Sequence, residues 1–246
     1  MYRKAHIFLI AALGFVAYAN SFDCTFHFDD FFNITENPAV RNFGSSPGFP
    51  FGGAGLKAIW NFAPTRFIGV LSFALNYHFN RLDSPRFAPG AAGVFGYHAV
   101  NFLIHIGSAL AVWKLVQLLF ATPVMKCRDA TCYVSTATAP LLVTWRSGKD
   151  TAALVCGLLF VSHPVQTQAV TYIVQRCISL AALLYLVTLC LYLEARLTGI
   201  RRRRNLFFTG AAITALLGML TKEIVFTLPF AILLFENSLS STIERG

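Results

Sequence analysis

The chain has 246 residues, of which 56% are hydrophobic and only 13% are charged. A soluble domain normally carries roughly 25% charged residues, so the composition argues against a soluble, disordered or coiled-coil protein. The formal net charge of +9 would suit nucleic-acid binding on its total alone. In an apolar chain the positions of the basic residues matter more than their sum, and the composition predicts a multi-span membrane protein.

A helix crosses the hydrocarbon core with about 20 mostly apolar residues, range about 17–25. The third and sixth candidates below are short by this standard, and the third can begin earlier because Ala139–Thr144 is also apolar. The prediction is an all-α, polytopic membrane bundle that forms one domain, 1–246, with about six helices. The candidate spans are Ala5–Phe22, Tyr97–Phe120, Thr151–Ser162, Ile178–Ala195, Leu206–Leu220 and Ile224–Glu236.

Basic residues set the predicted orientation, because cytoplasmic loops are enriched in Lys and Arg. Arg3 and Lys4 place the N-terminus in the cytoplasm, and the basic loops 121–150 and 196–205 fall on the same side. The outer segments are nearly neutral, with seven basic and six acidic residues. The first outer segment, 23–96, is expected to be functional because long structured loops rarely lack a role.

Two further segments have alternative interpretations. Arg3 and Lys4, followed by an apolar run and Ala17-Tyr18-Ala19, also fit a cleaved signal peptide, which leaves the rest of the topology unchanged. The apolar stretch Phe67–Phe79 is interrupted by polar residues, and it is predicted to lie at the membrane interface or to re-enter the membrane.

Asp29 and Asp30 stand side by side just after the first predicted span. Apolar surroundings raise the pKa of a carboxyl group, which suits a general base that deprotonates an acceptor hydroxyl. The same pair also fits a solvated loop in which an Asp caps a helix. No metal site is predicted, because no zinc-type spacing exists. Two adjacent carboxylates can bind a divalent cation, so this alternative stays open.

His98, Asn101 and His105 are spaced so that they share one face of the second predicted span. Polar residues within a span usually face the bundle interior or a cavity. The spacing therefore fits either a polar wall of an outer site or hydrogen bonds between helices.

His163 and Pro164 begin a segment that joins the third and fourth spans on the outer side. Pro164 suits the first turn of a helix, on which Gln168, Thr171 and Gln175 would share a face. Arg176 at the end of this segment fits either a phosphate clamp or a contact with lipid headgroups.

Lys222 and Glu223 occupy the outer turn between the last two spans. They fit a plain ion pair or a contact with the phosphate of a lipid-linked donor. The run Arg201–Arg204 is interpreted as a topology signal that touches anionic lipid. The sequence contains no Walker loop, nucleophile elbow or dinucleotide fingerprint.

Five motifs in order make the chain resemble the polytopic membrane glycosyltransferases that use lipid-linked donors, in particular the transmembrane and tetratricopeptide-repeat O-mannosyltransferase-like family with its bacterial members. Each motif is weak alone, but together they cover most of the chain. They are Phe28-Asp29-Asp30 with Ile34–Pro38, Arg66 with Leu71–Tyr77, Gly96–His105, His163–Val170 continuing to Gln175-Arg176, and Lys222-Glu223-Ile224 with Thr227-Leu228-Pro229.

The resemblance implies that Asp29 is the catalytic base, with Asp30 orienting it or sharing its role. In such enzymes the base activates an acceptor hydroxyl for attack on the anomeric carbon, and a polyprenyl phosphate leaves. No cofactor is implied, because the lipid-linked sugar is a substrate. The implied substrate-binding residues are Arg66, Arg176, Lys222 and Glu223 near the donor phosphate, and His98, Asn101, His163 and Gln168 along the cavity.

The expected activity is transfer of a sugar such as mannose to a hydroxyl, for example of a protein Ser or Thr, outside a bacterial inner membrane. The expected partners are membrane lipid, the polyprenyl-phosphate donor and a protein or glycan acceptor, without nucleic acid. The further spans and repeats of the family are missing from the 246 residues, which favours a fragment or a truncated, non-catalytic scaffold as the alternative. A transporter of a lipid-linked substrate should show inverted repeats, which the sequence lacks.

Overall fold

The computed structural model describes residues 2–44, 53–80, 94–122, 125 and 141–240. Every regular element in these ranges is a helix, which confirms the predicted all-α fold. Parts of the predicted outer segment 23–96 and of the predicted loop 121–150 lie outside the described residues. The long helices are α1 (Tyr2–Tyr18), α5 (Phe95–Phe120), α7 (Leu141–Ser162), α9 (Arg176–Leu197), α10 (Arg201–Met219) and α11 (Leu228–Ser240).

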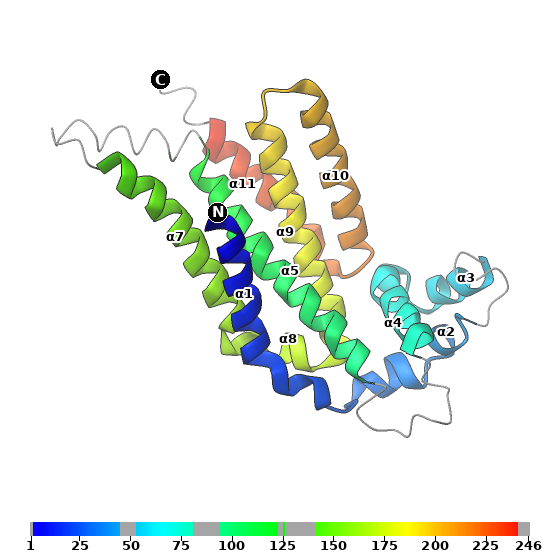
Figure 1. Ribbon diagram of the computed structural model, residues 1–246. Coiled ribbons are helices and arrows are strands. Elements are labelled where there is room, and N and C mark those ends of the chain that lie inside the picture. Colours follow the sequence, from blue (N-terminus) through cyan, green and yellow to red (C-terminus); the bar gives the residue numbers. More distant parts are fainter. Residues whose placement is uncertain (1, 45–52, 81–93, 123–124, 126–140, 241–246) are drawn as a thin grey trace.

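Shorter helices form the connections at one end of the molecule. Three of them, α2 to α4, make a small group beside the long helices, and α8 crosses under them (Figure 1). They are η1 (Ala19–Asp23), η2 (Phe31–Thr35), α2 (Pro38–Arg41), α3 (Gly53–Phe62), η3 (Pro64–Arg66), α4 (Phe67–Asn80), η5 (Pro164–Gln166), α8 (Thr167–Thr171), η6 (Ile173–Gln175) and η7 (Glu223–Thr227).

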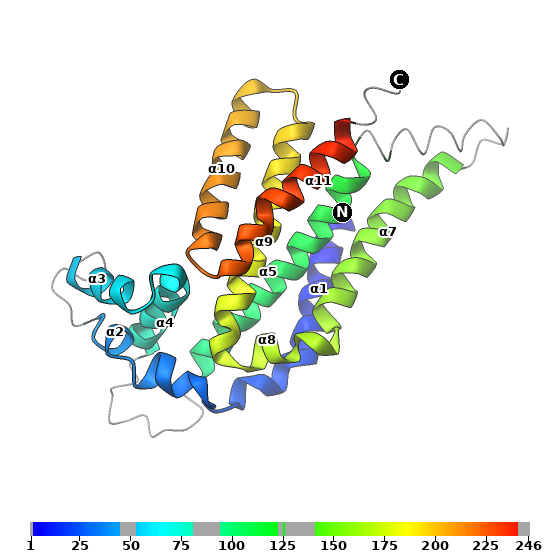
Figure 2. The same ribbon diagram turned by 180° about the vertical axis from the view of Figure 1, so that it is seen from behind.

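The six long helices alternate in direction. Helices α1, α7 and α10 run one way, and α5, α9 and α11 run the other way (Figures 1 and 2). The predicted outer segments consequently gather towards one end of the bundle. This arrangement agrees with the alternation of a polytopic membrane protein, while the orientation in the membrane stays a prediction.

Among the described residues, three helical segments are long and apolar enough to cross a membrane: Arg3–Phe22, Phe95–Phe120 and Ile173–Leu197. The count rises to five if each of two bent helix pairs is one span. Helix α10 starts with four arginines, and α11 has only 13 residues, so neither meets the same standard. The count of six spans therefore stays a prediction.

One of the two bent pairs is located where the sequence predicts an irregular membrane segment. One pair, Gly53–Phe62 with Pro64–Phe79, bends by 109°, as a broken span or a re-entrant loop does. It contains the stretch Phe67–Phe79, which the sequence predicts to be interfacial or re-entrant. The other pair, Gly148–Ser162 with Pro164–Thr171, bends by 48° at the start of the connection between α7 and α9.

Helix α7 begins ten residues earlier than the predicted span at Thr151, so residues 141–150 are helical and not a loop. Polar residues near its start are held against α5, which allows the helix to continue through them. Gln117 donates a hydrogen bond to Asp150 Oδ1 (3.2 Å), and Lys149 lies over the Phe120 ring, 6.0 Å from its centroid.

Large apolar side chains cover the outside of the long helices. Phe8 is 71% exposed, Val16 76% and Phe230 70%. A face of this kind is unfavourable in water and favourable in lipid. Arg196 and Glu236, which lie between α9 and α11, are paired with each other at 2.8 Å.

The first outer segment is held tightly against the bundle through α4. Gly69 on α4 lies so close to α9 that a Cβ at this position would be 2.5 Å from Cys177 Sγ. The N–H of Ile68 donates to the carbonyl of Leu220 (3.0 Å) just after α10. These contacts fix the distance from α4 to both α9 and the turn that follows α10.

We expect Gly69→Ala to destabilise the protein by about 1–3 kcal/mol, the usual cost of overpacking, because the added methyl group collides with Cys177 Sγ. The free energy of unfolding is measured by denaturant titration in detergent. Cys177→Ala removes the sulfur, so the double variant should recover most of the loss. Equal losses in the single and double variants would contradict the close packing of α4 on α9.

Candidate functional site

The two adjacent acids have different environments. Asp30 is 1% exposed, whereas Asp29 is exposed. Asp30 Oδ1 accepts a hydrogen bond from the Val174 N–H (2.7 Å), and Oδ2 accepts one from the His27 N–H (3.0 Å). Burial raises the pKa of the Asp30 carboxyl, and these two N–H groups oppose that rise. Asp30 thus fastens the first outer segment to η6.

The backbone turns sharply just before the pair. Phe28 has a φ of 42°, in the left-handed region that non-glycine residues rarely adopt. The Asp29 N–H donates to Tyr172 Oη (3.2 Å), and Asn33 Nδ2 donates to the Asp29 carbonyl (2.8 Å). The main chain of Asp29 is therefore held by hydrogen bonds at both its N–H and its carbonyl, while its carboxylate remains exposed.

Arg176 is completely buried at the start of α9. Its Nε donates to Asn101 Oδ1 (2.7 Å), Nη2 to the Tyr97 carbonyl (2.9 Å) and Nη1 to the Ser72 carbonyl (3.3 Å). Its guanidinium carbon also lies 4.8 Å from the Phe73 ring centroid and 5.3 Å from that of Tyr97. The guanidinium joins α9 to α4 and α5 and cannot reach a phosphate from this position.

The polar face of α5 is buried as well. His98 Nε2 is 2.9 Å from the Cys24 carbonyl, and His105 Nε2 is 3.0 Å from the Val161 carbonyl. Asn101 Nδ2 donates to the Ile173 carbonyl (3.3 Å). His98, Asn101 and Arg176 thus satisfy polar groups in the interior and are absent from the lining of the cavity described below, and the substrate-binding roles expected of them stay predictions.

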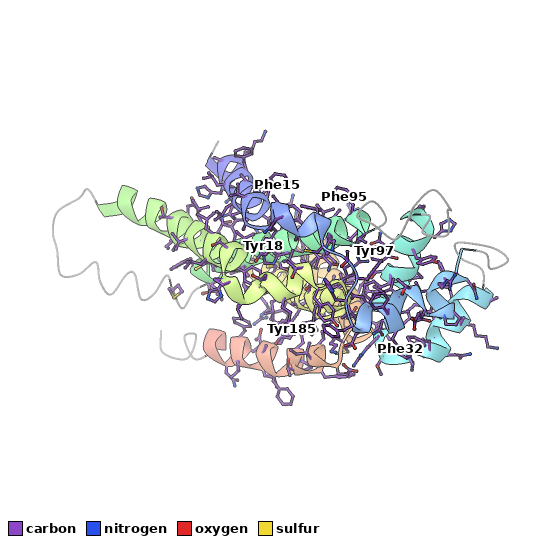
Figure 3. The ribbon with its side chains drawn as sticks, turned by 90° about the horizontal axis from the view of Figure 1, so that it is seen from below. Phe15, Tyr18, Phe32, Phe95, Tyr97 and Tyr185 are labelled. Carbon is purple, nitrogen blue, oxygen red and sulfur yellow. The ribbon has the colours of Figure 1, made fainter. Side chains whose placement is uncertain are left out.

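A cavity of about 570 Å³ lies where the first outer segment meets the ends of α9 and α10. Four of the predicted site residues line it: Asp29, Arg66, Lys222 and Glu223. Helix η2, which carries Phe32, and the start of α5, which carries Tyr97, lie at this end of the molecule (Figure 3). The sequence thus identified a carboxylate and two cations that converge from three separate segments.

One main-chain bond sets the spacing of the two cations. Ile68, whose N–H bonds the Leu220 carbonyl, stands two residues after Arg66, and Lys222 stands two residues after Leu220. The two basic residues thus flank a fixed point of the backbone. Both side chains line the cavity.

The charged residues of the cavity are loosely paired. Arg66 Nε is 3.6 Å from Glu223 Oε1, and Thr65 Oγ1 donates to the same oxygen at 3.4 Å. The Glu223 main-chain N–H, and then the charges of Arg66 and Lys222, lower the pKa of the Glu223 carboxyl. Lys222 makes no ion pair with any residue of the described ranges.

His163 and Gln168 lie away from the cavity lining. His163 Nδ1 accepts the Val165 N–H (3.2 Å) and so caps η5. Gln168 and Gln175 do not share a helix face as expected, because the chain is extended at Tyr172 (φ −90°, ψ 113°) and breaks the helical register. Gln175, on the other side of that break, lines the cavity.

The cavity also contains residues that the sequence gave no reason to choose. Asn33 and Thr65 add polar groups, and Phe32 and Phe62 form an aromatic side with ring centroids 6.2 Å apart. Among the described residues no group of three or more His, Cys, Asp or Glu side chains could hold a metal ion. Two carboxylates, two cations and an aromatic surface suit a polar organic ligand that carries an anionic group.

These features define the class of protein: a helical membrane protein in which the segment 23–96 and the ends of two helices line a charged cavity. The chain is 29% identical to protein O-mannosyl-transferase Tmtc3 of Drosophila melanogaster over 188 residues, 73% of this chain and 18% of that protein. It is 29% identical to Tmtc2 of the same species over 247 aligned positions, 95% of this chain and 22% of that protein. Protein O-mannosyl-transferase TMTC4 of Homo sapiens is 26% identical over 190 residues, 76% and 22% of the two chains.

These similarities confirm the predicted resemblance to the O-mannosyltransferase-like family. The chain spans about a fifth of the length of these relatives. No family profile and no solved structure matches it.

We expect Asp30→Ala to lower the free energy of unfolding by about 1–3 kcal/mol, because the N–H groups of His27 and Val174 lose their acceptor. Asp29→Ala is the matched control and should stay within about 0.5 kcal/mol of the unaltered chain. Denaturant titration in detergent measures both variants. Equal effects at the two positions would contradict the division between a structural and an exposed acid.

Proposed function

We propose that the cavity is a glycosyl-transfer site, which moves a sugar from a polyprenyl phosphate to an acceptor hydroxyl. The observation that carries this proposal is the convergence of an exposed carboxylate, Asp29, with two cations, Arg66 and Lys222, in one cavity. The relatives named above support a mannose donor and a protein hydroxyl as acceptor, since each is a protein O-mannosyl-transferase by name.

Asp29 has the properties of the base in this reaction. Both oxygens of Asp30 accept main-chain hydrogen bonds, whereas Asp29 lines the cavity with its main chain fixed by Tyr172 and Asn33. The Asp29 carboxylate takes the proton of the acceptor hydroxyl, and the hydroxyl oxygen attacks the anomeric carbon of the sugar. The bond from that carbon to the phosphate oxygen breaks, and the phosphate leaves with the electron pair.

Arg66 and Lys222 stabilise the leaving group. A sugar-linked polyprenyl phosphate carries one negative charge, and the phosphate gains a second charge as the sugar departs. Cations placed where charge develops lower the barrier, because they bind the transition state more tightly than the donor.

The surroundings of the cavity fit a donor that resides in a membrane. Ile178, on the lining, is 41% exposed, and nearby Ile224 and Phe226 are 58% and 57% exposed. A prenyl chain can lie along such apolar surface while its phosphate occupies the charged part. We place the N-terminus in the cytoplasm and the cavity outside, following the basic residues. A bacterial inner membrane stays a prediction from the resemblance.

Asp29→Asn should reduce sugar transfer about 10²- to 10⁴-fold, the usual contribution of a general base, with little change in the KM for the donor. Transfer from polyprenyl-phosphate mannose to a Ser/Thr peptide by the purified 246-residue chain in phosphate-free detergent measures this loss. Glu36→Gln removes an exposed carboxylate outside the cavity lining and should retain activity. Absence of transfer by the unaltered chain, or an unchanged rate in Asp29→Asn, would sink the proposal and leave the scaffold alternative.

Arg66→Gln and Lys222→Gln should each weaken binding of farnesyl phosphate about tenfold or more, because each loses a charge-assisted contact with the phosphate. Calorimetric titration of the same preparation measures the affinity. Lys57→Gln, on α3 and away from the cavity lining, is the matched control and should leave the affinity unchanged. A similar affinity in all three variants would exclude a phosphate from this cavity.

A further inference from the structure

We propose that Glu223 competes with the donor phosphate for Arg66, so that the donor binds by exchanging one ion pair for another. This inference rests on the proposed function and adds a role that the transfer chemistry does not require. Glu223 would set the affinity for polyprenyl phosphates and assist release of the product.

The Arg66–Glu223 pair has the geometry of a contact that exchanges readily. Its atoms are 3.6 Å apart, beyond a good hydrogen bond, and the side chains are 48% and 47% exposed. Exposed pairs of this kind contribute only about 0–1 kcal/mol. The free energy lost when an incoming phosphate displaces the Glu223 carboxylate from Arg66 is therefore small.

A second Arg–Glu pair in the same chain provides the contrast. Arg196 and Glu236 make two close contacts, Nε to Oε1 at 2.8 Å and Nη2 to Oε2 at 2.9 Å, and Tyr192 donates to the same carboxylate. That pair joins α9 to α11 with the two-point geometry that makes Arg–carboxylate contacts strong. The cavity pair lacks this geometry, although both its residues have the same chemistry.

The charge balance of the cavity also favours an exchange. The lining holds two cations, Arg66 and Lys222, and two carboxylates, Asp29 and Glu223. A phosphate adds one negative charge as the donor and two as the product. With Asp29 needed as the base, Glu223 is the carboxylate that must move away from Arg66.

Glu223 is placed where such a movement is feasible. It is the first residue of η7, exposed, and it follows an extended residue, Lys222 (φ −162°, ψ 143°). The lowered pKa of its carboxyl keeps it ionised at neutral pH, so protonation does not remove the competitor. Rotation of the side chain away from Arg66 is the remaining way to admit the phosphate.

The test measures farnesyl phosphate binding by calorimetry to the full 246-residue chain in phosphate-free detergent. Glu223→Gln should bind about two- to fivefold more tightly, the factor expected for one exposed ion pair. Glu36→Gln, which removes a carboxylate away from the cavity lining, should leave the affinity unchanged. In an Arg66→Gln background, Glu223→Gln should give no further gain, because the contested cation is gone.

Three results would overturn the inference: unchanged binding in Glu223→Gln, weaker binding in Glu223→Gln, or a gain that persists without Arg66. A gain that persists without Arg66 would show that loss of a negative charge strengthens phosphate binding in general, without an exchange of ion pairs at Arg66. Thr65→Val is a second probe that keeps both charges, and loss of its hydrogen bond to Glu223 should tighten binding in the same direction. If the unaltered chain does not bind farnesyl phosphate, or binds it independently of Arg66 and Lys222, the proposed function fails together with this inference.

Discussion

The structure depends on how four residues, Ile173–Arg176, are fixed, which comprise η6 and the first residue of α9. Asp30 accepts the Val174 N–H, and Asn101 binds the carbonyl of Ile173. The guanidinium of Arg176 then joins this point to α4 and α5, with two aromatic rings beside it. A guanidinium buried without a carboxylate contact is expensive, and its three hydrogen bonds and two cation–π contacts offset that cost. Segments far apart in the sequence are therefore held in one arrangement.

This anchoring explains why two neighbouring acids have different roles. Because Asp30 points inward to accept hydrogen bonds, the adjacent residue on the strained turn at Phe28 points outward. One carboxylate is used to hold the loop and the other is available to a ligand. A strained backbone conformation costs of order 1–3 kcal/mol and persists only where its surroundings fix it, and the hydrogen bonds of Asp30 supply that constraint.

Hydropathy predicted the positions of the long helices well, because lipid-facing helices need long apolar runs whatever their neighbours are. It left the start of α7 open between Thr151 and the earlier apolar stretch Ala139–Thr144, and the structure has the earlier start, with polar residues held by α5. The order of motifs also identified the four charged residues that line the cavity, at element ends on one predicted side. Hydropathy could not separate them from His98, Asn101 and Arg176, which look equally functional in sequence.

The reason for that ambiguity lies in the partners of the buried residues. His98, Asn101 and Arg176 bind mostly main-chain carbonyls, and every residue has a carbonyl, so no side-chain pattern marks the partner. Gln168 shows a second limit: a single extended residue, Tyr172, shifts the register and places Gln175 in the cavity instead. Sequence reasoning finds polar residues that matter, but burial decides whether they support the fold or face a ligand.

Main-chain groups that no sequence pattern marks also position the two cations of the cavity. Arg66 and Lys222 are 156 positions apart in the sequence, yet a single main-chain hydrogen bond, Ile68 to Leu220, fixes the backbone beside both. Gly69, the residue after Ile68, lets α4 pack closely on α9, because a Cβ there would be 2.5 Å from Cys177 Sγ. Phosphate recognition would thus rely on a glycine and two backbone groups that carry no charge. A substitution that moved α4 would therefore weaken anion binding, because the field at the phosphate falls with the distance to each cation.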